Sequence, residues 1–104
     1  MNIELTRDAQ KAAAKLYKEY LNRVKSGQSK HESKKFSDEE LTSLYADEHP
    51  MDFQAELQEL IRVFAIQTNI WDDITLSDSF IIHMENKFKD SLKDVLSFLS
   101  QFIP

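Results

Sequence analysis

The segment from Ile74 to Phe88 constrains the fold more than any other, because it indicates a short strand that runs directly into a helix. Ile74 and Leu76 are two residues apart and would face the same side of a strand. Ser77 can cap the N-terminus of a helix, and Asp78 would lie in its first turn, where a negative charge suits the helix dipole. The chain is therefore expected to contain both a sheet and helices.

Helices are expected throughout the first half of the chain. Thr6 is placed to cap a helix whose apolar residues recur every three or four positions until Gly27, where glycine favours a left-handed cap. A capping-box pattern at Ser29-Lys-His-Glu32 indicates a short helical turn, and a second one at Ser37-Asp-Glu-Glu40 predicts a helix over 38–46.

The second half predicts a helix, a hairpin and a long final helix. The first of these is expected over 53–65, with Asp52 as its N-cap. β-branched residues become frequent between 66 and 76, which predicts a short β-hairpin. From 78 onward, apolar residues step by three or four with no interrupting Pro or Gly, which predicts one continuous helix over 78–103. At ~1.5 Å per residue this helix would be about 37 Å long.

Composition limits the classes of protein to which the chain can belong. At 104 residues with 41% hydrophobic content, we expect a single domain over 1–104 with a packed core. The absence of cysteine excludes a disulfide framework and a thiolate zinc site. The N-terminus lacks the apolar stretch of a signal peptide, and no apolar run approaches a membrane span. We therefore expect a cytoplasmic protein that does not use a membrane.

Charge is distributed unevenly along the chain. Residues 1–35 carry nine Lys or Arg against four Asp or Glu, whereas residues 36–61 carry eight acids and no Lys or Arg. The net charge of the whole chain is −5. The middle of the chain is therefore expected to repel polyanions.

The expected order of helix, helix, helix, hairpin, helix resembles that of winged-helix proteins. The run Leu76-Ser-Asp-Ser-Phe-Ile-Ile-His-Met-Glu85 is similar to their end, where the last wing strand runs into Leu-Ser/Thr-x-x-Gly and then a helix. Phe80 stands where that pattern has glycine. The runs at 15–21 and 84–89 also look like those of small uncharacterised winged-helix-like proteins of Gram-positive bacteria and their prophages. The resemblance implies a mainly α (α+β) fold with three helices, a short β-hairpin wing and a long C-terminal helix.

No catalytic or metal-binding motif is visible. The three histidines, His31, His49 and His83, do not have the spacing of metal ligands in a known motif. Asp52, Glu56 and Glu59 would share one helical face, which we interpret as a solvated surface. We therefore expect no enzyme, no cofactor and no bound metal.

DNA binding is the function that the resemblance invites, and charge disfavours it. The recognition helix would be the one over 53–65, yet acids occupy its first turns and Arg62 alone offsets them. A DNA-binding transcription regulator would have to use the basic residues Arg23, Lys25, Lys30, Lys34 and Lys35. A further alternative is an acidic mimic of nucleic acid, which rests only on the block at 36–61.

Protein binding is the function that the sequence favours. The apolar density of the last helix needs a cover, which could be the first helix or the same helix of a second chain. The residues of such a dimer interface would be Leu92, Val95, Phe98, Leu99 and Phe102. Trp71 falls in the expected wing, where it could contact a partner or cover the core. The chain is thus interpreted as a non-enzymatic interaction or regulatory module that contacts itself, as a homodimer, or another protein.

Overall fold

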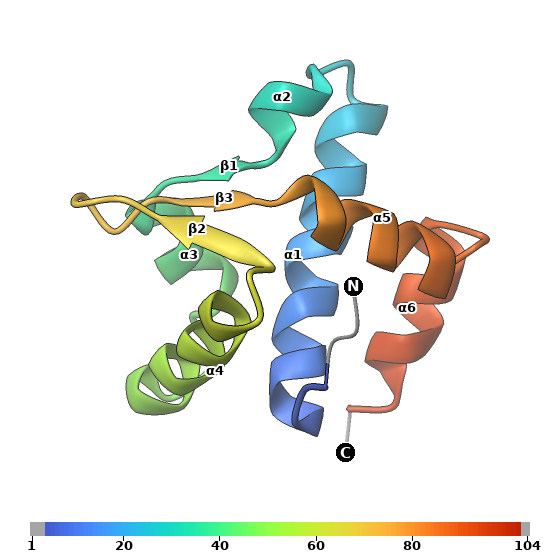
Figure 1. Ribbon diagram of the computed structural model, residues 1–104. Helices are drawn as coiled ribbons and strands as arrows, with labels where there is room; N and C mark the ends of the chain where they lie inside the picture. Colours follow the sequence, from blue (N-terminus) through green and yellow to red (C-terminus); the bar gives the residue numbers. More distant parts are fainter. Residues whose placement is uncertain (1–3, 103–104) are drawn as a thin grey trace.

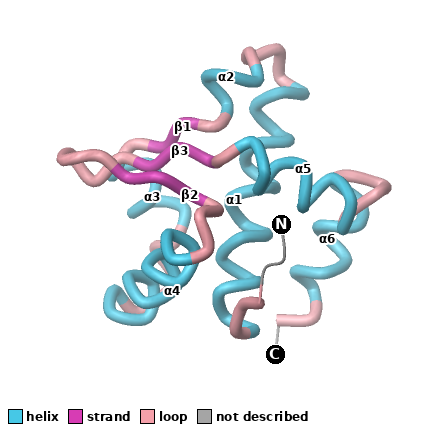
Figure 2. The backbone as a smooth tube through the Cα atoms, in the orientation of Figure 1, coloured by secondary structure: helices cyan, strands magenta, loops and turns pink. Residues whose placement is uncertain are grey.

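Six helices and three strands follow one another along residues 4–102, the part of the chain that the computed structural model describes (Figure 1). In chain order they are α1 (Arg7–Lys25), α2 (Lys30–Ser33), β1 (Lys35–Phe36), α3 (Asp38–Leu44), α4 (Pro50–Arg62), β2 (Ile66–Thr68), β3 (Ile74–Leu76), α5 (Asp78–Lys87) and α6 (Leu92–Ser100). Helices predominate and the strands form one small sheet (Figure 2). The expected α+β class is confirmed.

Side-chain caps begin the helices largely where the sequence predicts. Thr6 caps α1 and Ser77 caps α5, each through a hydroxyl that accepts a backbone hydrogen bond. Ser37 and Glu40 form a complete capping box at the start of α3. Gly27 follows the end of α1 with φ 104°, a conformation that is easy only for glycine.

Helix α4 begins earlier than expected. Its N-cap is His49, whose Nδ1 accepts a hydrogen bond from the backbone N–H of Met51 at 3.1 Å, and Pro50 occupies the first helical position. Proline suits this position because its φ fits a helix and its missing N–H would have no partner there. The prediction that Asp52 is the N-cap is therefore wrong, and Asp52 lies in the first turn instead.

The sheet is antiparallel, with strand order β1-β3-β2. Ile74 in the central strand lies opposite Phe36 of β1 and Thr68 of β2, and Leu76 lies opposite Ile66. One face of the sheet joins the core, since the four apolar residues of these pairs are buried. The hairpin predicted between 66 and 76 is confirmed. Strand β1 was not predicted, because two residues are too few to show an alternating pattern.

Helix α1 is the centre of the fold. It runs between α4 and α6, which make the most extensive contacts with it (Figure 1). The small side chains on its surface are almost completely buried and allow close approach by neighbouring helices. These residues are Ala9, Ala12, Ala13 and Ala14. The Tyr45 hydroxyl, at the end of α3, donates a hydrogen bond to the Ala12 carbonyl at 2.6 Å and ties α3 to α1.

The continuous helix predicted over 78–103 is wrong, because the chain folds back between α5 and α6. Phe88 leaves the helical conformation, and Ser91 has φ 53°. The buried Phe88 ring packs on Tyr17 and edge-on against Phe98, with centroid distances of 6.2 and 5.6 Å. A straight helix of about 37 Å would exceed the longest dimension of the fold, 33 Å. The turn instead lets α6 lie against α1. Residue 103, the last of the predicted helix, lies outside the described residues.

Candidate interaction surfaces

The hairpin tip, residues 69–73, presents two large apolar side chains to solvent. Ile70 is 84% exposed and Trp71 is 70% exposed. The side-chain oxygen of Asn69 accepts hydrogen bonds from the backbone N–H groups of Trp71 and Asp73 at 2.9 and 3.1 Å, which hold the turn in shape. The tip extends beyond the sheet (Figure 1), and at its base the Asp73 carboxylate accepts a hydrogen bond from the backbone N–H of Asp38 in α3 at 3.1 Å. Trp71 therefore lies in the hairpin and does not cover the core.

Helix α4 combines an apolar buried side with an outer side that carries one acid and one base, Asp52 and Arg62. Its buried apolar residues are Phe53, Leu57 and Leu60. On the outer side, Met51 and Asp52 are exposed in the first turn. Arg62, in the last turn, is the only basic residue of the helix. The helix therefore offers little positive charge to a phosphate backbone.

Phe64, just after α4, has an unusual backbone and an unusual exposure. Its φ is 62°, a left-handed conformation in which a bulky residue is strained. The backbone N–H groups of Phe64 and Ala65 donate to the carbonyls of Ile61 and Leu60, both at 3.0 Å, as in the Schellman motif that usually has glycine at this position. The Phe64 side chain is nonetheless 78% exposed. Strain of this kind clusters at functional positions, so Phe64 is a candidate contact residue.

Glu56 and Glu59 do not belong to the solvated acidic face that the sequence predicts. Glu56 is only 8% exposed. Glu59 faces the start of α1, where its carboxylate accepts hydrogen bonds from the Thr6 backbone N–H at 2.7 Å and from the Thr6 hydroxyl at 3.1 Å. The prediction fails for these two residues because the α1–α4 contact turns them inward. Asp52 alone remains at the surface.

The basic residues at 23–35 are largely engaged within the chain. The Arg23 guanidinium donates to the Lys35 carbonyl at 2.6 Å, pairs with Glu19 and Glu40 and lies 4.1 Å from the centroid of a buried phenylalanine ring. Lys34 pairs with Asp78 at 2.7 Å. Lys35 pairs with Glu32 at 3.5 Å, whereas Lys25 and Lys30 are exposed without an ion pair inside 4–102.

This basic segment and α4 do not form one surface. Helix α2 lies at the top of the molecule in Figure 1 and α4 at the bottom. A nucleic acid that followed the segment would therefore not be held against α4. The structure links Arg23 to Lys35 through the Lys35 carbonyl, and it separates this segment from the helix that the resemblance assigns to DNA.

Helix α6 directs most of its apolar residues towards the rest of the chain. Val95 is completely buried. Phe98 and Leu99 pack on the core from a half-buried position, and Leu92 and Phe102 are also half-buried. The most exposed large apolar side chain of α6 is that of Leu96, at 45%. The candidate interface did not include this residue. Helix α1 thus covers much of the apolar surface of α6 that a second chain was expected to cover as the alternative.

The three histidines lie in separate places. His31 is exposed on α2, His49 caps α4, and His83 is half-buried on α5. Within residues 4–102, no group of three or more His, Cys, Asp or Glu side chains is arranged to hold a metal ion.

No protein-family model, curated protein or solved structure matches this chain. Among residues 4–102, no helix has both the length and the apolar character that crossing a membrane requires.

Proposed function

We propose that this chain is a winged-helix-like module without catalytic activity that binds another protein through the hairpin tip. The order of helices followed by a hairpin and a helix, on which the resemblance rests, supports the winged-helix part of the proposal. Its added C-terminal segment packs on α1 as α6 and completes the core.

The exposure of Ile70 and Trp71 carries the proposal. A tryptophan and an isoleucine side by side on a shaped turn present apolar area that folding leaves in water. Each such side chain gains roughly 1.5–3 kcal/mol when a partner buries it fully. Tryptophan is also enriched among the residues that dominate binding energy at protein interfaces.

Charge selects protein over DNA as the partner. Duplex DNA is bound chiefly by Lys and Arg that neutralise phosphates. Here the tip carries Asp72 and Asp73, and α4 has Arg62 as its one basic residue. An apolar anchor flanked by acids suits a partner surface that is apolar with basic groups around it.

Affinity capture with a tip variant tests the proposal. The double variant Ile70→Ser, Trp71→Ser removes the apolar anchor, and Ile82→Ser, which removes an exposed isoleucine from α5, is the matched control. A partner that meets the proposal is retained by the wild type and the control and lost with the double variant. The same partner, once purified, should bind the wild type directly. A partner that all three forms retain equally would overturn the role of the tip.

A homodimer is the second candidate, and Leu96 is the observation that favours it. Within the described chain, it is the one large apolar residue of α6 whose side chain is exposed, at 45%. Light scattering behind size exclusion gives the mass directly. A dimer that Leu96→Glu converts to a monomer would support this candidate, and a ~12 kDa monomer at micromolar concentration would reject it.

A further inference from the structure

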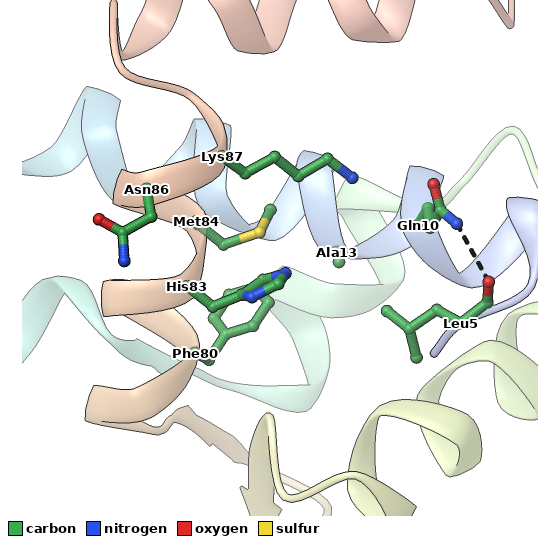
Figure 3. Close-up of a pocket in the computed structure, with 8 residues that line it drawn as sticks. All are labelled: Leu5, Gln10, Ala13, Phe80, His83, Met84, Asn86 and Lys87. Atoms are coloured by element: carbon green, nitrogen blue, oxygen red, sulfur yellow. Dashed lines mark hydrogen bonds between the residues drawn. The ribbon is translucent and has the colours of Figure 1, made fainter. Parts of the chain in front are cut away.

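A pocket of about 400 Å³ opens between α5 and the N-terminal part of α1 (Figure 3). Its volume is at the lower end of the range of about 300–1,000 Å³ that ligand pockets usually have, which suits a small molecule. The residues that line it are Leu5, Gln10, Ala13, Phe80, His83, Met84, Asn86 and Lys87.

The pocket has an apolar floor. Phe80 and Ala13 lie behind this floor and are almost completely buried, so the apolar surface that a ligand can reach comes from Leu5 and the edge of Met84. The Gln10 side-chain N–H donates to the Leu5 carbonyl at 3.0 Å and fixes the end of the pocket next to α1. A ligand with an apolar body would therefore replace water over the side chains of Leu5 and Met84.

The ionisable groups of the pocket are basic. His83 and Lys87 lie one turn apart on α5, and both side chains point across the pocket towards α1, whereas Asn86 points away (Figure 3). No acidic side chain of residues 4–102 lines the pocket. Lys87 also forms no ion pair with any described residue. Two groups that can carry a positive charge or donate a hydrogen bond thus face the same pocket, and no described acidic residue lies beside them there.

The surroundings of Lys87 and His83 disfavour their positive charge when the pocket holds only water. Partial burial lowers the pKa of Lys87, although its ammonium lies 4.7 Å from the centroid of the Phe98 ring and 5.5 Å from that of Phe88, where the ring faces favour the cation. Burial, followed by the charge of Lys87, lowers the pKa of His83. An anion between the two groups would remove this cost, because it would pair with the ammonium and offset its repulsion.

We propose that this pocket binds a small monocarboxylate whose apolar body lies against Leu5 and the exposed edge of Met84 and whose carboxylate accepts hydrogen bonds from Lys87 and His83. A carboxylate fits better than inorganic phosphate, because phosphate has no apolar body to cover the floor. The site is independent of the hairpin tip, since no residue of 69–73 lines it.

Titration of the protein with hexanoate, followed by NMR, tests the site. Amide signals of α5 and the first half of α1 should shift and saturate, with a dissociation constant of ~1 mM for a ligand of this size. The pKa of His83 should rise when hexanoate is bound, because the carboxylate stabilises the protonated imidazole. Hexanol and inorganic phosphate should each bind at least about fivefold more weakly than hexanoate, since each lacks one of the two matching features.

Two matched lysine variants complete the test. Lys87→Gln should weaken hexanoate binding about tenfold, the loss expected for one charge-assisted hydrogen bond, and Lys89→Gln should leave it unchanged. The Lys87 side chain reaches the surface and is only partly buried, and Lys89 is exposed, so both variants should fold. The absence of saturable shifts up to ~10 mM, equal affinity for hexanol, or unchanged affinity in Lys87→Gln would each overturn the proposal.

Discussion

The carboxyl groups of Glu56 on α4 and Glu48 in the turn before it interact, and Oε2 of each is buried without a hydrogen-bond partner in the described chain. Burial first, and then the charge of Glu48, raises the pKa of Glu56 to about 7. Asp8 adds further negative charge, and Lys11, which lies 3.6 Å from Glu48, opposes it. A proton held between the two carboxyl groups would satisfy both unpartnered oxygens.

The stability of the protein should therefore fall as pH rises from about 4.5 to about 7. The unfolded state loses the Glu56 proton near 4.5, whereas the folded state keeps it until about 7, so unfolding releases a proton within this interval. Glu56→Gln removes the titration and should raise the free energy of unfolding by roughly 1–3 kcal/mol at pH 8, with little effect at pH 4. Urea denaturation at both pH values measures this. Glu39→Gln, an exposed site, is the control, and an equal effect of Glu56→Gln at both pH values would contradict the interpretation.

Phe64→Gly should stabilise the protein. Glycine adopts the left-handed conformation of residue 64 without strain, and the exposed phenylalanine contributes little burial, so the free energy of unfolding should rise by about 1 kcal/mol. Phe64→Ala removes the same ring but keeps the strained backbone. It should therefore leave stability within ~0.5 kcal/mol of the wild type. If Phe64→Gly were less stable than Phe64→Ala in chemical denaturation, backbone strain at this position would be excluded.

Phe98 and Leu96, two residues apart on α6, should respond differently to truncation. The Phe98 ring packs edge-on against Phe88 and Phe102, with centroid distances of 5.6 and 5.3 Å. Phe98→Ala should cost about 1–3 kcal/mol of stability, less than for a fully buried phenylalanine because Phe98 is half-buried. Leu96→Ala should stay within ~0.5 kcal/mol at a concentration where the protein is monomeric. Similar losses for both variants would show that α6 is not oriented as described.

Local signals were sufficient to predict several elements of the fold. The caps at Thr6, Ser37 and Ser77 involve residues three positions apart at most, so their pattern is visible in the sequence. The hairpin was visible in the same way from its β-branched residues, and Trp71 was correctly placed within it. These features depend little on which distant segment packs against them.

Tertiary contacts determined the features that the sequence did not reveal. The helical period continues through Phe88, and only its packing on Tyr17 explains why the helix ends there. Glu56 occupies a position that looks solvated by spacing, and its contact with Glu48 depends on the path of the turn before α4. Phe64 carries no sequence signal of a left-handed conformation, because the hydrogen bonds that define its turn can be satisfied with any side chain.

Fluorescence anisotropy with random duplex DNA across a salt series tests the central claim that protein, and not DNA, is the partner. Acids occupy the region from Phe36 to Ile61 without a single Lys or Arg, and the basic residues at 23–35 largely pair within the chain. The dissociation constant near physiological salt should therefore be weaker than ~10 µM. Sub-micromolar binding with a steep salt dependence, abolished by Lys34→Glu with Lys35→Glu, would contradict the claim.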